Sequence, residues 1–232
     1  MTAAQPPSVL RLIRAVAKKN GARLFEAGKH FRFSITNDNA FDYCGLGETL
    51  RDVWVRLGGE HQVANASLAV ASCQALRHYN IAIGEKALRI GLGNCRWPAR
   101  FEIISKKPTI ILDGAQNGAS MQALRKTIKQ RFGRSALWLI FGIAKDKELA
   151  DTCRAASLIS ENIIVTKANN PRAMSPQRLA KYFPSTSRMF MSESVREALG
   201  LAASKTNSNG LIVITGSLYV CAEARAIVRT RQ

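Results

Sequence analysis

The chain has 232 residues, of which 47% are hydrophobic, and its formal net charge at pH 7 is +18. This composition excludes an intrinsically disordered chain and is sufficient for one large folded domain or two small ones. No apolar run reaches the roughly 18 residues that a membrane-spanning helix needs. The segment Met1–Pro7 lacks the charged and apolar layout of a secretion signal. We therefore expect a cytoplasmic protein with no membrane partner.

Cysteine and histidine usage argues against a disulfide framework and against a metal centre. The 5 cysteines stand singly along the chain, and the 3 histidines are far from metal-ligand spacing. An odd number of scattered cysteines is typical of a reducing compartment. We expect neither a zinc site nor any other metal site built from these side chains.

The excess of basic residues is spread over the whole sequence and is not confined to a tail. Such a charge attracts polyanions, among them nucleotides, polyglutamate and, without sequence preference, nucleic acid. The alternative is a solvated basic surface with no dedicated partner. No zinc finger, helix-turn-helix pattern or basic strand with interleaved aromatic residues indicates a specific nucleic-acid partner.

The first part of the chain mixes helical and strand patterns. Val9, Ile13 and Val16 recur at helical spacing, and Lys18 and Lys19 close that stretch. Turn-forming residues then separate short runs of strand character, which predict a small antiparallel sheet. The expected elements are a helix over 8–20, strands over 23–26, 30–35 and 49–57, a long helix over 61–78 and a shorter helix over 83–91.

From residue 101 onward, strand-like runs alternate regularly with helical patterns. The expected strands are 109–112, 137–142, 162–166, 187–191 and 211–215, and the expected helices are 120–132, 147–157, 176–183, 195–205 and 218–229. On the first of these helices we expect an apolar stripe of Met121, Leu124, Ile128 and Phe132, with Arg125, Lys126, Lys129 and Arg131 outside. The alternation predicts an α/β fold with a doubly wound, mostly parallel sheet and flanking helices. We expect the domain boundary at 104/105.

Chemistry is expected where the first strand of this region ends. An apolar run stops at Asp113, turns on Gly114 and leads into a helical pattern, which is typical of a βα unit. Open α/β sheets bind ligands outside the carboxyl ends of their strands, so Asp113 lies where a ligand is expected. A second interpretation is that Asp113 only caps the helix that follows, since acids are favoured at that position.

Several motifs, in order, resemble the folylpolyglutamate synthase/dihydrofolate synthase family of the Mur ligase superfamily. The stretch Leu112–Gly118 is similar to the family's Leu-Asp-Gly-Ala-His-Asn-Pro, with glutamine in place of histidine and glycine in place of proline. His61–Ala66 resembles a family helix motif, and Trp97–Arg100 resembles its Trp-Pro-Gly-Arg linker. Phe141–Lys147 and Thr215–Tyr219 resemble two further strand-to-helix turns. The order of the motifs, more than any one of them, identifies the chain as a member.

The resemblance implies a reaction and its substrates. Members of this family join L-glutamate to the carboxyl group of a folate or of dihydropteroate, using ATP and Mg²⁺. The carboxylate is first phosphorylated, and the amine of glutamate then displaces phosphate from the acyl phosphate. The expected activity is therefore that of an ATP-dependent amide-bond ligase.

The resemblance also assigns ATP contacts to Asn65, Arg100 and Asp113, and places Gln116 where the family has its histidine. The chemistry of each residue suits that role. An amide such as that of Asn65 offers both a donor and an acceptor to an adenine edge, and Arg100 can bind phosphate oxygens as a fork. Gln116 can donate a hydrogen bond but cannot carry a positive charge, so it should hold phosphate more weakly than histidine. The competing interpretation is that Asn65 is a polar helix residue and Arg100 a surface residue of the linker.

Weaker expectations concern the substrate. Asp146, Lys147 and Ser217 occupy positions at which the family's motifs approach substrate. A cap and a solvated lysine are the simpler interpretation of Asp146 and Lys147. Ser217, at a helix start, is expected to be an N-cap or small-anion site first and a substrate contact second.

The family's phosphate loop has no counterpart in this sequence. No Gly-x-x-x-x-Gly-Lys-Ser/Thr pattern is present, and the family's Mg²⁺ ligands and folate pocket are expected upstream of Met1. The sequence therefore predicts a partial central ATP-binding domain over 1–104 and a complete C-terminal domain over 105–232. We expect that it is not competent alone and that a missing N-terminal fragment is its partner. The alternative is a non-catalytic remnant or a nucleotide- or glutamate-binding interaction module.

One structural consequence of a partial first domain is also expected. The apolar face of the predicted helix over 61–78 includes Val63, Val70 and Leu76. If the sheet that covers this face were absent, these side chains would form an exposed apolar patch of the kind that marks a partner surface or an aggregation liability.

Overall fold

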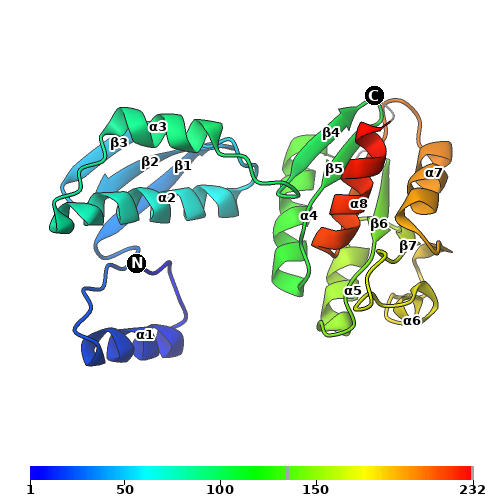
Figure 1. Ribbon diagram of the computed structural model, residues 1–232, viewed down its shortest axis with the longest axis horizontal. Helices are drawn as coiled ribbons and strands as arrows, with labels where there is room; N and C mark the ends of the chain where they lie inside the picture. Colours follow the sequence, from blue (N-terminus) through cyan, green and yellow to red (C-terminus); the bar gives the residue numbers. More distant parts are fainter. Residues whose placement is uncertain (134–135, 231–232) are drawn as a thin grey trace. The chain divides into compact units, whose positions relative to one another are not determined.

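The computed structural model describes residues 1–133 and 136–230 and divides into two compact units, Met1–Arg96 and Trp97–Gln232 (Figure 1). Each unit has its own hydrophobic core. The division lies upstream of the 104/105 boundary that the sequence suggests. The reason is strand β4 (Glu102–Lys106), which pairs with β5 (Thr109–Leu112) and so belongs to the second unit.

The second unit is built on a six-stranded sheet with the strand order β4-β5-β9-β6-β7-β8. Only β4, at the edge, runs antiparallel to its neighbour; the other pairings are parallel. The parallel strands other than β5 are β6 (Leu137–Phe141), β7 (Asn162–Val165), β8 (Arg188–Met191) and β9 (Leu211–Thr215). The predicted doubly wound, mostly parallel α/β sheet is confirmed.

Helices cover both faces of this sheet, because successive strand residues point to opposite sides. Ile111 belongs to the core cluster that contains Met121, whereas its neighbour Leu112 belongs to the cluster that contains Val220. The first cluster joins the sheet to α4 (Gly118–Phe132), α5 (Leu149–Ser157) and α6 (Pro176–Ala180); the second joins it to α7 (Val195–Lys205) and α8 (Leu218–Arg229). Figure 1 shows these helices packed around the strands.

The prediction for α4 is right for the apolar stripe and wrong for one cation. Arg125, Lys126 and Lys129 are exposed as expected. Arg131 is only half-exposed, because its guanidinium carbon lies 5.2 Å from the centroid of the Phe101 ring. A cation in this position over an aromatic face is attracted by the ring, so Arg131 covers part of the core.

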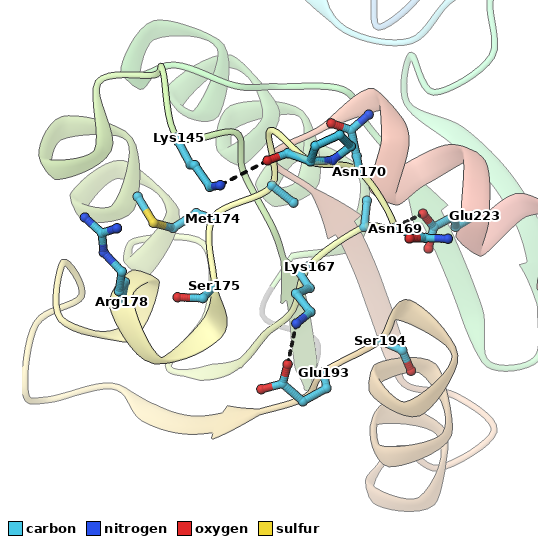
Figure 2. Close-up of a pocket in the computed structure, with 13 residues that line it drawn as sticks. Lys145, Lys167, Asn169, Asn170, Met174, Ser175, Arg178, Glu193, Ser194 and Glu223 are labelled. Atoms are coloured by element: carbon cyan, nitrogen blue, oxygen red, sulfur yellow. Dashed lines mark hydrogen bonds and ion pairs between the residues drawn. The ribbon is translucent and has the colours of Figure 1, made fainter.

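The loops that follow β6, β7 and β8 meet at the carboxyl edge of the sheet. There they surround a cavity of about 780 Å³, drawn in Figure 2. Parallel strands bring their carboxyl ends to one edge, so this position follows from the topology alone.

The first unit contains a three-stranded antiparallel sheet, β1 (Phe31–Asn37), β2 (Ala40–Gly45) and β3 (Glu48–Trp54). The helices α2 (Glu60–Ala75) and α3 (Glu85–Asn94) pack against it, and a 3₁₀ turn, η1 (Leu76–Tyr79), continues α2. The expected small antiparallel sheet is confirmed, but its strands differ from those predicted. Residues 23–26 form no strand apart from a single bridge at Glu26, and β2 was not expected.

The expectation of an uncovered helix face is wrong for α2. Val63 and Val70 are fully buried, in a cluster with Phe41 and Val53 of the sheet. The three strands of this unit are therefore sufficient to cover α2. The uncovered helix is instead α1 (Pro7–Lys19), which has no buried residue and is tied to Glu26 by Arg14, whose Nη2 lies 2.6 Å from a carboxylate oxygen.

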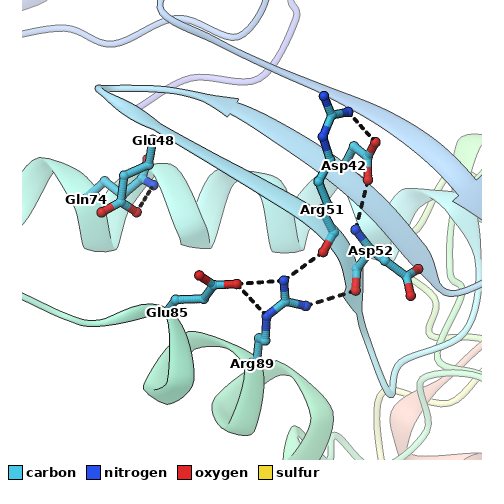
Figure 3. A network of polar contacts seen from close by, with 7 residues as sticks. All are labelled: Asp42, Glu48, Arg51, Asp52, Gln74, Glu85 and Arg89. Carbon is cyan, nitrogen blue, oxygen red and sulfur yellow. Dashed lines mark hydrogen bonds and ion pairs between the residues drawn. The ribbon is translucent and has the colours of Figure 1, made fainter.

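A polar network fixes an irregular point in β3 (Figure 3). The pairing of β2 with β3 shifts register between Phe41 and Tyr43, and Asp52 has a φ of 47°, in the left-handed region. The Asp42 carboxylate accepts from the backbone N–H of Asp52 at 2.8 Å. From α3, Arg89 donates to the carbonyl oxygens of Asp52 at 3.0 Å and of Arg51 at 2.7 Å. Arg89 thus satisfies backbone acceptors that the bulge removes from the sheet.

We predict that Arg89→Ala lowers the free energy of unfolding by about 1–3 kcal/mol, because it leaves two carbonyl groups without their charged donor. Denaturant titration measures this change. Arg51→Ala is the matched control: its guanidinium is 76% exposed and pairs with Asp42, so its loss should cost less. Equal losses in the two variants would contradict the role given to Arg89.

Candidate functional site

The Asp113 carboxylate joins two segments at the carboxyl end of β5. Its Oδ2 accepts from the backbone N–H of Phe101 at 2.9 Å, and its Oδ1 accepts from that of Ala115 at 2.9 Å. The residue is only 7% exposed. A buried carboxylate is stable only where hydrogen bonds replace water, and here two backbone donors do so. Asp113 therefore holds the linker around residue 101 against the loop that follows β5.

The linker itself is tightly bent around Arg100. Ala99 and Phe101, on either side of it, both have left-handed φ values, 56° and 46°. The Ala99 N–H donates to a Glu102 carboxylate oxygen at 3.0 Å, and the Ala99 carbonyl accepts from Gly114 N–H at 2.7 Å. Non-glycine residues seldom adopt this conformation, so the surrounding hydrogen bonds must maintain it.

This bend places Arg100 over the turn at Gly114. A Cβ on Gly114 would lie 3.2 Å from Arg100 Nη1 and 2.5 Å from Leu218 Cδ2, so the turn has no room for a side chain. Arg100 is half-buried, and its guanidinium has no hydrogen-bond or ion-pair partner among residues 1–133 and 136–230. A guanidinium in that state is available to an anionic ligand.

The interpretation of Asp113 as a helix cap is wrong. The N-cap of α4 is Asn117, whose side chain accepts from Ser120 N–H at 2.9 Å in a capping box. Gln116 precedes this cap, is half-buried and donates its backbone N–H to Ser120 Oγ at 3.0 Å. The Gln116 side-chain amide, three residues after Asp113, has no hydrogen-bond partner within the described part of the chain.

Cys221 packs against this turn, and its thiol is not reactive. Its Sγ is 3.5 Å from the carbonyl oxygens of Asp113 and Ile214. Burial, with a smaller contribution from the nearby Asp113 charge, raises the pKa of Cys221 to about 12. The thiol therefore stays protonated at neutral pH, and its role is packing rather than nucleophilic attack.

Asn65 belongs to the first unit. It is an exposed residue of α2, and its Nδ2 donates to Gln62 Oε1 at 3.4 Å, near the limit for a hydrogen bond. Its amide is therefore accessible to solvent, and its predicted contact with adenine stays a prediction.

The weaker substrate candidates lie in the loops after β6 and β9. An Asp146 oxygen is 2.5 Å from Arg172 Nη2, and this hydrogen bond holds the pKa of Asp146 below its usual range. Lys147 is half-exposed, and its ammonium group has no hydrogen-bond or ion-pair partner in the part of the chain that the structure describes. Ser217 is the N-cap of α8, and its Oγ accepts from Tyr219 N–H at 3.2 Å. Asp146 thus forms an ion pair rather than a cap, and Ser217 is an N-cap, as expected.

The cavity at the carboxyl edge contains charged residues that the sequence did not single out. Those with charged side chains are Lys145, Lys167, Arg178, Glu193 and Glu223. They come from separate strand-to-helix loops and helices, as Figure 2 shows. The strand order could have indicated them. Basic and acidic residues occur shortly after β6, β7 and β8, and the carboxyl ends of these parallel strands lie at one edge of the sheet.

A metal cluster and a membrane-spanning helix are both absent from the described residues. Within 1–133 and 136–230, no group of three or more His, Cys, Asp and Glu side chains is arranged to hold a metal ion. Over the same residues, no helix has the length and apolar character to cross a bilayer.

Comparison with known proteins decides the family. Residues 99–218 match the family model described as Mur ligase, glutamate ligase domain. The chain belongs to the Mur ligase family. Within it, the chain corresponds to the C-terminal portion of the folylpolyglutamate synthase/dihydrofolate synthase group, as the sequence motifs predict.

Curated relatives and solved structures support this assignment to the Mur ligase family. A dihydrofolate synthase/folylpolyglutamate synthase of Bacillus subtilis is 31% identical over 97% of this chain and 53% of its own length. A Mycobacterium tuberculosis folylpolyglutamate synthase solved with ADP and AMPPCP matches with a TM-score of 0.86 and 26% identity, over 97% of this chain and 54% of that chain. A Thermotoga maritima folylpolyglutamate synthase matches with a TM-score of 0.78 and 30% identity, over 98% and 53%. The chain spans about half the length of these relatives.

We predict that Ala99→Gly raises the free energy of unfolding by about 0.5–1 kcal/mol. Relief of the left-handed strain at residue 99 outweighs the added flexibility of the unfolded chain. The matched control is Ala203→Gly, at an exposed position within α7, which should lower stability by a similar amount. Denaturant titration of both variants gives the two signs, and a loss of stability in both would contradict the strain assigned to the linker.

Proposed function

We propose that this chain supplies the glutamate-accepting part of an ATP-dependent ligase that acts on the carboxyl group of a folate or of dihydropteroate. The observation that carries the proposal is that two features lie at the same edge of the sheet of the second unit, where its parallel strands end. One is the Arg100 guanidinium, held over the Asp113 turn. The other is the charged cavity that opens between the loops after β6, β7 and β8.

The proposed reaction has two steps. A carboxylate oxygen of the folate-type substrate attacks the γ-phosphorus of ATP, the bond to the β-phosphate oxygen breaks, and ADP leaves. The neutral amine of L-glutamate then attacks the acyl carbon, the carbon–oxygen bond to phosphate breaks, and inorganic phosphate leaves. The nitrogen loses one proton to solvent as the amide forms. Both steps develop charge on phosphate oxygens, so a fixed cation beside them lowers both barriers.

The roles proposed for the residues follow from their surroundings. Arg100, which is half-buried and has no partner among the described residues, binds phosphate oxygens as a fork. Asp113 acts through the backbone, because both of its carboxylate oxygens hold N–H groups that fix the linker and the turn. Gln116 donates one neutral hydrogen bond, which is weaker than the bond a charged histidine would give.

Other parts of the proposed site lie outside these residues. Mg²⁺ would neutralise phosphate charge in such a reaction, but the described residues contain no cluster that fits it. The sequence has no phosphate-loop pattern. We therefore propose that catalysis requires phosphate-binding groups beyond those this chain provides.

A chimera tests the proposal. This chain would replace the matching C-terminal portion of the Bacillus subtilis relative, and ATP-dependent addition of labelled L-glutamate to tetrahydrofolate and to dihydropteroate would be measured. We expect the chimera to be active and this chain alone to be inactive. Arg100→Ala in the chimera should lower turnover by about 100-fold, the effect of removing one fixed donor from a transition-state oxyanion. Arg125→Ala, at an exposed position on α4, is the control and should change nothing.

A second candidate function is a non-catalytic module that binds nucleotide or glutamate-like ligands. The specific observation in its favour is the pair of departures from the family motif, Gln116 and Gly118. A folded chimera that binds ATP and glutamate but forms no product would support this candidate. Product formation by this chain alone would instead refute the requirement for additional phosphate-binding groups.

A further inference from the structure

The segments on either side of α1 run parallel to each other. Thr2 and Glu26 form a parallel bridge, and both residues are buried. Thr2 N–H donates to the Phe25 carbonyl at 2.9 Å, and the Thr2 carbonyl accepts from Ala27 N–H at 3.0 Å. Two parallel extended segments that are joined by a helix have the arrangement of a βαβ unit. Here the pairing is limited to a single bridge, so the unit is only begun.

One side of α1 is held to this pair, and the opposite side is uncovered. Arg14 contacts both carboxylate oxygens of Glu26, through Nε at 3.0 Å and through Nη2 at 2.6 Å. Away from this ion pair, apolar residues recur at spacings of three and four residues and form what we call the α1 stripe. Its members Val9, Leu12 and Val16 are 41%, 65% and 50% exposed. An amphipathic helix takes most of its stability from burial of its apolar side, so α1 lacks its main stabilising contact.

The parallel bridge indicates what would cover the α1 stripe. Parallel strands occur in sheets whose faces are covered by helices, and the helix of a βαβ unit packs on the sheet to which its own strands belong. The sheet of the first unit is antiparallel, and α2 and α3 pack against it. Residues 1–96 contain isolated parallel bridges but no parallel sheet on which α1 could pack.

The side chains of the α1 stripe favour a protein surface over a lipid surface. Val9, Leu12 and Val16 are aliphatic, and α1 lacks the tryptophan and phenylalanine that helices at a membrane surface often place on their apolar side. The relatives indicate a source for the covering surface. The chain spans about half their length and corresponds to their C-terminal portion, so the relatives have a further portion before the matched half.

We propose that the α1 stripe and the paired segments at Thr2 and Glu26 are the docking surface for that preceding portion. It adds parallel strands beside the Thr2–Glu26 pair by backbone hydrogen bonds and places an apolar sheet face on the α1 stripe. The proposal is the same whether that portion is joined to this chain or is a separate polypeptide. Docking of this kind requires neither ATP nor a folate substrate, so it does not depend on the proposed reaction.

Amide hydrogen exchange in α1 tests this docking in two proteins, this chain alone and the chimera whose preceding portion comes from the Bacillus subtilis relative. In this chain alone, we expect the α1 amides to exchange almost as fast as those of an unfolded peptide, because no side chain of the helix is buried. In the chimera they should exchange at least about 100-fold more slowly, since burial of one leucine or valine alone corresponds to about 10-fold.

The variant Leu12→Gln removes one member of the α1 stripe and keeps a good helix-forming residue. In the chimera it should make the α1 amides exchange about 10-fold faster, and in this chain alone it should change nothing. Arg11→Gln is the matched control, because Arg11 is exposed and lies away from the α1 stripe. It should leave exchange unchanged in both proteins.

Fast exchange of the α1 amides in the chimera would overturn the proposal, and so would equal effects of Leu12→Gln and Arg11→Gln. Protection of α1 in this chain alone would also contradict it. If that protection increased with protein concentration, the occupant of the α1 stripe would be a second copy of this chain. None of these results would decide the proposed ligase reaction, because the readout is exchange rather than turnover.

Discussion

The second unit depends on one buried carboxylate. Asp113 stands at the end of β5 and is bound by backbone N–H groups from segments on both of its sides, Phe101 and Ala115. The burial of an ionised carboxylate costs several kcal/mol when no partner replaces water. Here the two donors supply that replacement, and in return the carboxylate fixes the backbone of the linker and of the turn. Arg100 is oriented because the residues on both sides of it are held.

The same turn is tied to the neighbouring strand. The Ala115 carbonyl accepts from Gly216 N–H at 2.9 Å, directly after β9, and Cys221 of α8 lies beneath Asp113. The start of α8 and the ligand edge of β5 are therefore one rigid element. Because Glu223 lies further along α8, this contact relates the Glu223 wall of the cavity to the turn that carries Arg100. The reaction proposed for this chain, in which an amine meets an acyl phosphate, would need such a fixed separation.

The sequence predicted the second unit well because its strands are buried on both faces. Runs such as Ile110–Leu112 and Leu211–Thr215 are apolar and rich in β-branched residues, and their limits were right to within a residue. The edge strand β4 was missed, since half-exposed residues give no continuous apolar run. In the first unit, β2 was missed because Asp42 and Gly45, of types that are depleted in strands, interrupt its pattern.

Candidate site residues that belong to motifs could be named from the sequence, and candidates that depend on tertiary contacts could not. Asp113 and Arg100 were singled out by spacing and resemblance, but nothing local indicates that the Asp113 carboxylate binds the backbone of Phe101. Arg178 and Glu223 lie far apart in the sequence and share a cavity only through the order of the strands. The expectation about Val63 failed for the same reason, because its cover comes from strands distant in the sequence.

Amide hydrogen exchange at Phe101 and Ala115 tests the role of the Asp113 carboxylate most directly. In the unmodified chain both amides should be protected, since each donates to Asp113. In Asp113→Ala both should exchange at least about 10-fold faster, while Val213, in the centre of β9, keeps its protection. If the Phe101 amide stayed protected in that variant, the carboxylate would not be what joins the linker to the turn, and the orientation of Arg100 would need another cause.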